Sequence, residues 1–345
     1  MTAYRRLLET LNAEPRTWLI TGVAGFIGSH LLEALLELGQ RVVGLDNFST
    51  GTPRNLADIE ARVSAEKWAR FSLRRGSVAD IGVCREASDH VDYVLHQAGF
   101  VSVPLSIEDP VACHDTNVTG TLNMLVAARD NRVQRFVFAS SSAVYGDSQH
   151  FPQAEKPIGQ ALSPYGASKQ VGEIYARQFF EHYGLESIGL RYFNIFGPRQ
   201  NPMGGYAAVI PQWIATLLRG EECVIHGDGT ATRDFCPVKN VVVANLLAAA
   251  TGSQSAPGEV FNVGLGRQTN LDALYRLIST EVAAQVQGFT THSPRHGPPR
   301  AGDILHSGAD ISRIERELGY EPEENLERGI AETVRWFCEE ARRER

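Results

Sequence analysis

A tyrosine, a lysine and three serines have the types and the spacing that proton transfer needs. Tyr165 and Lys169 are four residues apart at the start of a predicted helix, so their side chains lie on one helix face. An ammonium beside a phenol stabilises the phenolate, which can then take a proton from a hydroxyl. The serines, residues 140–142, follow an apolar stretch typical of a buried strand, and one hydroxyl would orient the same oxygen across a cleft. Tyr-x-x-x-Lys alone also occurs as a solvated pair on helices; the serines favour the catalytic interpretation.

A glycine-rich turn near the N-terminus would position a cofactor beside these groups. Residues 18–20 are apolar and predict a buried strand, and residues 27–38 have the apolar periodicity of a helix. Between them, Gly22 would allow a tight turn, Gly25 would let backbone N–H groups approach a pyrophosphate, and Gly28 would let the helix pack closely on the strand. The first gap is one residue longer than in the standard dinucleotide motif, and a glycine triplet alone also fits an ordinary strand–turn–helix.

Asp46 ends a second predicted strand, about 20 residues after the glycines. A carboxylate at this point takes the adenosine ribose hydroxyls of a dinucleotide and repels a 2′-phosphate, so Asp46 predicts NAD rather than NADP. A helix cap or a turn is the other use of such an aspartate. Together with the glycine turn, the cofactor interpretation is the better supported.

Stretches typical of strands alternate with helix-like stretches through the first part of the chain. This order predicts an α/β fold with a Rossmann-type, doubly wound parallel sheet. Right-handed crossovers place the carboxyl ends of the strands at one edge, so the turns that follow them should line a single cleft. Those turns are residues 22–28, 46–51, 77–78, 97–102 and 140–146.

The chain is predicted to divide near residue 193, where Gly and Pro become more frequent and strands and helices no longer alternate regularly. Residues 1–193 are predicted to form the NAD-binding Rossmann domain, with an N-terminal extension at 1–17. Residues 194–345 are predicted to form a smaller, mixed α/β C-terminal lobe for the substrate. We expect some interchange of chain between the two.

Composition excludes several other classes of protein. The 345 residues carry a net charge of −7 and form no basic surface pattern, so nucleic acid is not an expected partner. No apolar run approaches the ~18 residues of a membrane helix, and no signal peptide is recognisable. The five cysteines and ten histidines have no metal-type spacing, so we expect no metal site, reduced thiols and a cytoplasmic protein.

Together, these features resemble the extended short-chain dehydrogenase/reductases, and among them the nucleotide-sugar 4-epimerases. The stretch 191–213 most resembles bacterial epimerases that act on UDP-N-acetylhexosamines for surface polysaccharides. The matching motifs are Thr21–Gly28, Asp46-Asn47, His96–Gly99, Asn117-Val118, Ser140–Ser142, Tyr165-x-x-x-Lys169, Leu190–Asn194, Gly227–Phe235 and Arg300–Asp303.

The resemblance implies a mechanism. Tyr165 would remove the proton of the sugar 4-hydroxyl while the 4-hydrogen passes as hydride to tightly bound NAD, giving a transient 4-keto sugar. The sugar would turn and take the hydride back on its other face, so NAD is regenerated in each cycle. Ser141, with Ser142 as its neighbour, would hold the 4-oxygen, and Lys169 would also bind the nicotinamide ribose.

The resemblance also implies two sets of binding residues. One departure is Ser77, which stands where the family usually has an aspartate that contacts the adenine amino group. We expect NAD to bind with a neutral, shorter contact there. The cofactor set is Gly22, Gly25, Phe26, Ile27, Asp46, Asn47, Ser49, Thr50, Gly51, Ser77, Val78, Gln97, Ala98, Asn117, Tyr165, Lys169 and Tyr192. The substrate set is Val101, Ser102, Ser141, Tyr165, Asn194, Gln200, Ala208, Val209, Arg233, Arg300, Asp303 and Ser307.

Ser307 bears on which UDP-sugar is used. In relatives restricted to glucose and galactose a tyrosine closes the pocket beside the sugar 2-position, whereas the small Ser307 leaves room for an N-acetyl group. The resemblance therefore predicts 4-epimerisation of UDP-GlcNAc and UDP-GalNAc, with UDP-Glc and UDP-Gal as possible further substrates. It also implies a homodimer joined by a four-helix bundle, with contributions from the helix at 117–128 and the helix after Tyr165.

Three alternatives follow. A UDP-hexuronic acid 4-epimerase, acting on UDP-GlcA or UDP-GalNAcA, would need a group such as Arg199 to accept the sugar carboxylate. A catalytically inactive nucleotide-sugar-binding protein would not need the intact serine, tyrosine and lysine. Related dehydratases and decarboxylases carry an acidic residue just after the Ser/Thr, where this chain has Ser142 and Ala143, so both are disfavoured.

Overall fold

The computed structural model describes residues 1–203, 207–290, 293–299 and 305–343. Its centre is a seven-stranded sheet with the order β11-β6-β5-β4-β1-β2-β3, in which every pairing is parallel. The order reverses between β1 and β4, as in a doubly wound Rossmann sheet, so the predicted fold class is confirmed. The strands are β1 (Thr17–Thr21), β2 (Arg41–Asp46), β3 (Phe71–Arg75), β4 (Tyr93–His96), β5 (Arg135–Ser141), β6 (Ser187–Tyr192) and β11 (Val260–Val263).

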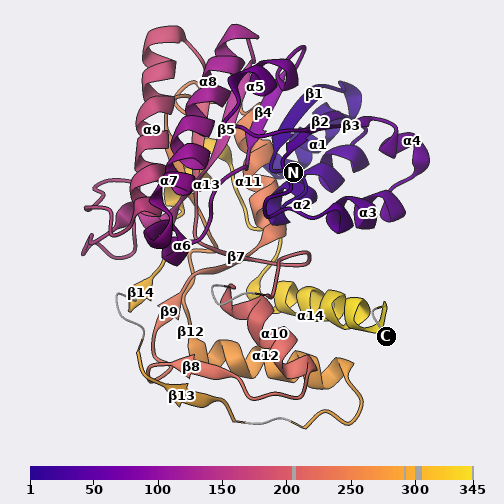
Figure 1. Cartoon of the computed structure of the whole chain (residues 1–345), viewed down its shortest axis with the longest axis vertical. Coiled ribbons are helices and arrows are strands. Elements are labelled where there is room, and N and C mark those ends of the chain that lie inside the picture. The colour runs from indigo at the N-terminus through magenta and orange to yellow at the C-terminus, as the bar shows by residue number, and fades with distance from the viewer. Residues whose placement is uncertain (204–206, 291–292, 300–304, 344–345) are drawn as a thin grey trace.

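Helices cover both faces of this sheet (Figure 1). The side chains of β1 alternate between two cores, because Trp18 and Ile20 pack on one face and Leu19 packs on the other. The first core is closed by α1 (Ala3–Ala13), α2 (Phe26–Glu37), α3 (Pro53–Arg62) and α11 (Val238–Ala250). The second is closed by α5 (Ile81–Ala87), α8 (Gly120–Asp130) and α9 (Pro164–Tyr183). Shorter helices are α4 (Ala65–Trp68), α6 (Val103–Glu108), α7 (Pro110–His114) and α13 (Ser312–Leu318).

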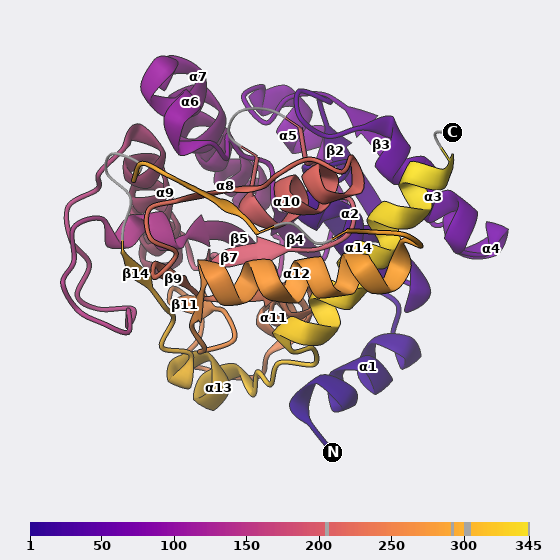
Figure 2. The ribbon, with the colours of Figure 1, turned by 90° about the horizontal axis from the view of Figure 1, so that it is seen from below.

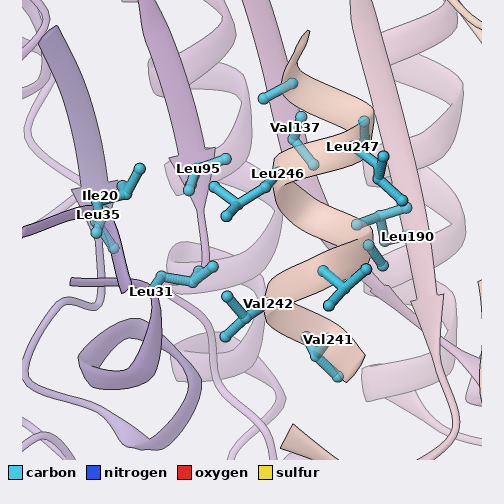
Figure 3. Close-up of a cluster of buried hydrophobic side chains, with 14 of the residues drawn as sticks. Ile20, Leu31, Leu35, Leu95, Val137, Leu190, Val241, Val242, Leu246 and Leu247 are labelled. Atoms are coloured by element: carbon cyan, nitrogen blue, oxygen red, sulfur yellow. The ribbon is translucent and has the colours of Figure 1, made fainter. Parts of the chain in front are cut away.

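Helix α11 is buried almost all round, which explains why its sequence lacks a polar face. Figure 3 shows Val242 and Leu246 on this helix pointing toward side chains from β1, β4 and α2. Both α11 and the edge strand β11 come from the part of the chain after residue 193, so that part contributes to the Rossmann core as well. The boundary near residue 193 itself stays a prediction.

The second lobe lies below the Rossmann part in Figure 1 and is built from short pieces. Three helices, α10 (Val209–Leu218), α12 (Leu271–Gln285) and α14 (Leu326–Arg343), share one apolar core, and Figure 2 shows them from below. The short pairings are β7 (Asn194–Phe196) with β10 (Phe235–Pro237), β8 (Val224–His226) with β13 (Arg295–Gly297), and β9 (Thr232–Arg233) with β12 (Thr269–Asn270) and β14 (His306–Ser307). Among the described helices, none is both long and apolar enough to span a bilayer.

Candidate active site

The glycine turn between β1 and α2 has the backbone geometry of an anion cradle. Gly22 has φ +69°, and a Cβ there would lie 2.9 Å from the backbone nitrogen of Ala98, so this position requires glycine. Helix α2 begins at Phe26, and its N-cap residue Gly25 has no side chain to cap the first N–H groups. Unpaired N–H groups at a helix N-terminus suit a diphosphate, so the turn fits the pyrophosphate of a dinucleotide.

Asp46 at the end of β2 serves the turn as well as the predicted ribose. Its Oδ2 accepts a hydrogen bond from the Ala24 backbone nitrogen at 2.8 Å, and its Oδ1 accepts one from the Phe48 nitrogen at 2.7 Å. Each carboxylate oxygen has a second lone pair, which leaves acceptor capacity for a ribose hydroxyl. The two uses that the sequence suggested for this aspartate are therefore compatible.

The predicted adenine contact, Ser77, lies in the turn after β3. Its hydroxyl accepts a hydrogen bond from the backbone nitrogen of Ala79 at 3.2 Å. The side-chain amide of Asn123 donates to the carbonyls of Val78 and Ala79, so α8 holds this turn in place. The turn is thus rigid, and the contact that its serine offers to a base is neutral.

Ser141, Tyr165 and Lys169 lie together where β5 ends and α9 begins. Ser163 caps α9 by accepting from the Gly166 nitrogen at 3.1 Å, which sets the helix start. The Ser141 side chain faces the Tyr165 phenol closely enough to lower its pKa. The ammonium of Lys169 lies 5.8 Å from the centre of the Tyr165 ring and donates to the Ala139 carbonyl at 2.9 Å. The structure thus brings three of the four predicted catalytic residues into one group, and the fourth, Ser142, begins the 3₁₀ turn Ser142–Tyr145.

The pKa values of this group differ from the simplest expectation. Burial raises the pKa of Tyr165, and the Ser141 side chain lowers it only in part. The predicted lowering by Lys169 is absent here, because the ammonium is directed to the Ala139 carbonyl and not to the phenol oxygen. Burial lowers the pKa of Lys169 to about 8, opposed by Cys113 and Glu173, so the amine keeps its proton at neutral pH.

Three predicted cofactor residues hold each other and the loop after β4. Gln97 accepts from the Tyr192 hydroxyl at 3.1 Å and donates to Asn245 at 3.0 Å, and Asn245 donates to the Tyr192 oxygen at 2.8 Å. Asn117, in a single π-helical turn at Asp115–Thr119, accepts from the Phe100 nitrogen at 2.7 Å. These side chains therefore position the backbone that follows β4, including residues 101–102.

Asn245 was not predicted from the sequence, although a buried asparagine in the otherwise apolar α11 is an unusual feature that could have identified it. A second missed group surrounds Glu173, one helical turn after Lys169. Its carboxylate makes a two-pronged ion pair with Arg191, at 2.8 and 2.7 Å, and accepts a hydrogen bond from Ser140. The side chains of Arg191 and Glu173 are only 3% and 10% exposed.

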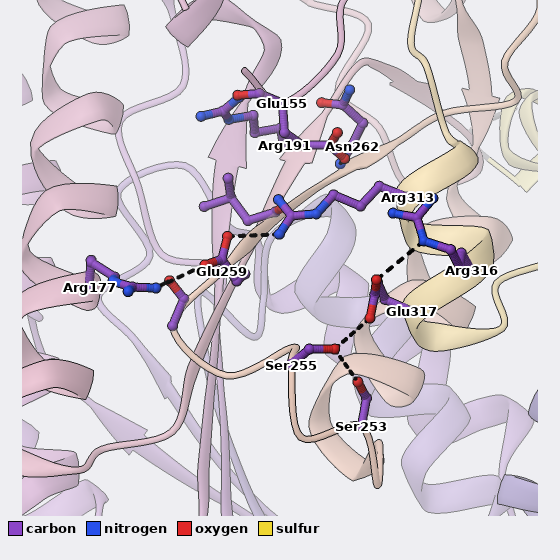
Figure 4. Close-up of polar contacts among 12 residues, drawn as sticks. Glu155, Arg177, Arg191, Ser253, Ser255, Glu259, Asn262, Arg313, Arg316 and Glu317 are labelled. Carbon is purple, nitrogen blue, oxygen red and sulfur yellow. Dashed lines mark hydrogen bonds and ion pairs between the residues drawn. The ribbon is translucent and has the colours of Figure 1, made fainter. Parts of the chain in front are cut away.

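This buried network extends away from the catalytic group. Arg191 donates to the Glu155 carbonyl at 2.8 Å, and the Glu155 carboxylate accepts from the Asn262 nitrogen at 3.0 Å. Asn262 also accepts from the Tyr145 hydroxyl in the turn after β5. Figure 4 shows Glu155, Arg191 and Asn262 together, beside the surface ion pairs of Glu259. The end of β5 is thus held by a charged, fully paired interior.

On the other side of the cleft, a pocket of about 390 Å³ opens in the second lobe. It combines aromatic and aliphatic walls with Arg233, and this combination suits a planar base and a phosphate. The Nη1 atom of Arg233 donates to the carbonyls of Thr232 at 2.9 Å and Leu305 at 3.2 Å. Four predicted substrate residues, Asn194, Ala208, Val209 and Arg233, line it with Phe193, Ile195, Phe196, Ala207, Ile210, Gln212, Trp213, Val224, His226, Phe235 and Leu271. The structure therefore brings residues far apart in sequence into one pocket.

The remaining substrate residues have different positions. Ser307 pairs with Arg233 across β14 and β9 and is 9% exposed. Gln200 donates to the Ile195 carbonyl at 3.1 Å. The predicted residues Arg300 and Asp303 lie outside the described residues.

Arg199, the candidate receptor for a sugar carboxylate, is buried against α2. Its guanidinium pairs with Glu33 and contacts the His30 ring nitrogen at 2.9 Å. It is not among the residues that line the pocket. Among the described residues there is no cluster of three or more His, Cys, Asp or Glu that could hold a metal ion.

Comparison with known proteins adds to this geometry. Residues 18–264 match the model of the NAD dependent epimerase/dehydratase family. A UDP-glucose 4-epimerase from Mycolicibacterium smegmatis is 36% identical over 323 residues, which cover 92% of this chain and 97% of that protein. The structure of a UDP-N-acetylglucosamine 4-epimerase from Methanobrevibacter ruminantium M1, in complex with UDP-N-acetylmuramic acid, has a TM-score of 0.86 and 35% identity, covering 95% and 99% of the two chains. A UDP-glucose 4-epimerase from Thermotoga maritima, with UDP-glucose, has a TM-score of 0.84 and 35% identity, covering 94% and 99%.

The buried ion pair behind the site yields a stability prediction. Glu173→Gln should lower the free energy of unfolding by about 3–5 kcal/mol, because it leaves the Arg191 charge buried without its counterion. The matched control is Glu181→Gln on the same helix, whose pair with Arg177 is exposed and should be worth about 0.5 kcal/mol or less. Denaturant unfolding followed by circular dichroism measures both, and equal small losses would contradict the assignment.

Proposed function

The chain belongs to the NAD-dependent epimerase/dehydratase family, and we propose that it interconverts the C4 epimers of a UDP-N-acetylhexosamine, UDP-GlcNAc and UDP-GalNAc. The observation that carries the proposal is the grouping of Ser141, Tyr165 and Lys169 at the sheet edge where the glycine turn also lies. Such a group acts on a secondary hydroxyl beside a dinucleotide. The two solved 4-epimerases with the same overall fold support a UDP-sugar substrate.

In the proposed reaction, the chain's own residues handle the proton. Tyr165 takes the proton of the sugar 4-hydroxyl and later returns it, and Ser141, which faces the phenol, holds the same oxygen. Lys169 keeps its proton at neutral pH, since its pKa is about 8, and its ammonium lies 5.8 Å from the centre of the Tyr165 ring. When bound in the glycine cradle with Asp46 at its ribose, NAD supplies the acceptor and donor of the 4-hydrogen as hydride.

The pocket in the second lobe supports the UDP part of the proposal. Its aromatic walls suit uracil, and Arg233 suits a phosphate of the diphosphate. Ser307 pairs with Arg233 in register, so a small side chain lies next to the proposed diphosphate site. A serine there gives an acetamido group both room and a hydrogen-bonding hydroxyl.

The uronic acid alternative receives no support from Arg199, because Glu33 already pairs with its buried guanidinium. A binding protein without activity would have no use for a serine that faces the Tyr165 phenol or for a buried lysine. An assay on a panel of UDP-sugars distinguishes both alternatives from the proposed reaction.

The central test is turnover on a panel of UDP-sugars, with products identified by NMR. We expect the wild-type protein to convert UDP-GlcNAc to UDP-GalNAc, and Tyr165→Phe to lose at least about 100-fold in kcat, because the proton acceptor is removed. Lys67→Met, which removes a half-buried cation paired with Glu37 at the end of α2 remote from the glycine turn, is the control and should be unaffected. Turnover of a UDP-hexuronic acid alone would replace the proposed substrate, and no effect of Tyr165→Phe would sink the mechanism.

Ser307 provides the test of the acetamido group. Ser307→Tyr should lower kcat/KM for UDP-GlcNAc by about 100-fold while leaving UDP-Glc turnover within a few fold, because the larger side chain fills the space beside the sugar 2-position. The measurement compares both sugars on the same enzyme preparation. Equal losses on both sugars would mean that Ser307 does not discriminate between them.

We also propose a homodimer that forms through α9 and the helices packed on it. Large exposed apolar side chains are concentrated there, with Ile107 in α6, Val111 in α7 and Ile174 in α9 each more than 60% exposed. Such a concentration on a folded chain marks an association surface. Two copies joined through α8 and α9 would give the four-helix bundle that the family resemblance implies.

Ile174→Glu should convert this dimer to a monomer, since a charge would be buried in the interface. Light scattering on the protein as it elutes from a size-exclusion column gives the molar mass of the assembly directly. Leu73→Glu in β3, an exposed apolar position away from α9, is the control and should remain dimeric. A monomeric wild-type protein would overturn the proposal.

A further inference from the structure

The proposed substrate residues of the second lobe meet at one buried residue, Asp234. Its backbone carbonyl accepts a hydrogen bond from the Asn194 nitrogen at 3.1 Å, and its own nitrogen donates to the Ser307 carbonyl at 3.0 Å. Arg233 precedes it in β9 and pairs with Ser307 in β14. Asp234 therefore joins three segments that are far apart in sequence.

The Asp234 carboxylate ties these segments to a fourth one. It is fully buried, and its oxygens accept from the backbone nitrogens of Leu265 at 2.9 Å, Gly266 at 2.9 Å and Ala309 at 3.4 Å. A Cβ at position 264 would lie 2.6 Å from the Oδ2 atom of Asp234, so the glycine there leaves the space that this carboxylate occupies. The acid is not among the residues that line the pocket around Arg233, and its partners in these bonds are backbone nitrogens.

Burying a carboxylate costs folding free energy, and the hydrogen bonds from the backbone nitrogens offset part of this cost. Burial raises the pKa of Asp234 to about 6, and the backbone N–H bonds act against that rise. An apolar side chain of similar size would fill the space without this cost. It would not hold the loop at 264–266 and the end of β14 in one arrangement.

We propose that Asp234 is a positioning residue for substrate binding, which holds Asn194, Arg233 and Ser307 in one geometry without touching the substrate. The inference rests on the proposed function for the roles of those three residues. It goes further in assigning to one buried acid the shape of the UDP-sugar side of the cleft. The catalytic group lies on β5 and α9 of the Rossmann part, so binding and chemistry should respond separately.

The test is Asp234→Asn, with KM, kcat and the affinity for UDP measured together. The amide has the same shape as the carboxylate, but its NH₂ group would replace an oxygen that accepts from a backbone N–H group in the wild-type protein. Two donors would then face each other. We expect KM for the UDP-sugar and Kd for UDP, measured by calorimetry, to rise about 10-fold or more, with kcat within about twofold. Asp228→Asn is the matched control, because its exposed carboxylate lies in the β8–β9 connection before Asp234 and accepts from the backbone nitrogen and the hydroxyl of Thr230. It should change neither constant.

A second variant covers the case in which Asp234→Asn does not fold. Gly264→Ala keeps the acid but pushes a methyl group against it, and should give the same rise in KM and in Kd for UDP. Unchanged KM and Kd in a folded Asp234→Asn protein, or in Gly264→Ala where the first does not fold, would overturn the inference. So would equal losses in kcat and affinity. UDP binding needs no turnover, so a wild-type protein that binds UDP but epimerises no sugar would refute the proposed reaction and leave this test intact.

Discussion

The parallel sheet imposes the constraint on which the rest of this molecule depends. Parallel strands joined by right-handed crossovers end at the same edge, so the turns after β1, β2, β4 and β5 meet there. The glycine cradle and Gln97 lie in these turns, and Asp46 and Ser141 are the last residues of β2 and β5. No single turn forms the candidate site. The turns form one site together because they lie at the same edge of the sheet.

Burial of polar groups holds that edge in shape. Glu173 and Arg191 neutralise each other behind Ser140, and Gln97, Tyr192 and Asn245 satisfy each other beneath the loop after β4. Buried polar groups stabilise the fold only when each has its hydrogen-bonding or ionic partner, so the geometry of the site depends on all members of these networks. The same rule applies to Asp234 in the second lobe, where backbone N–H groups surround the carboxylate.

The two lobes contain different parts of the candidate site. The Rossmann part carries the glycine turn and the group of Ser141, Tyr165 and Lys169, and the second lobe carries the pocket around Arg233. They are not independent, because β11 and α11 return to the Rossmann core after the first strands of the second lobe. The family match over residues 18–264 spans this return, which agrees with a site built from both parts.

Local sequence by itself determined the elements whose cause is local. The glycine spacing, the acid at the end of β2 and the four-residue spacing of Tyr165 and Lys169 follow from turn geometry and helical periodicity. Only the tertiary structure decided the partners of Glu173, Asn245 and Asp234, and the burial of Arg199 against Glu33. It also reversed the expected pKa shift of Tyr165, because burial depends on what packs around a side chain. Periodicity is a property of neighbours in sequence, whereas desolvation and pairing are properties of neighbours in space.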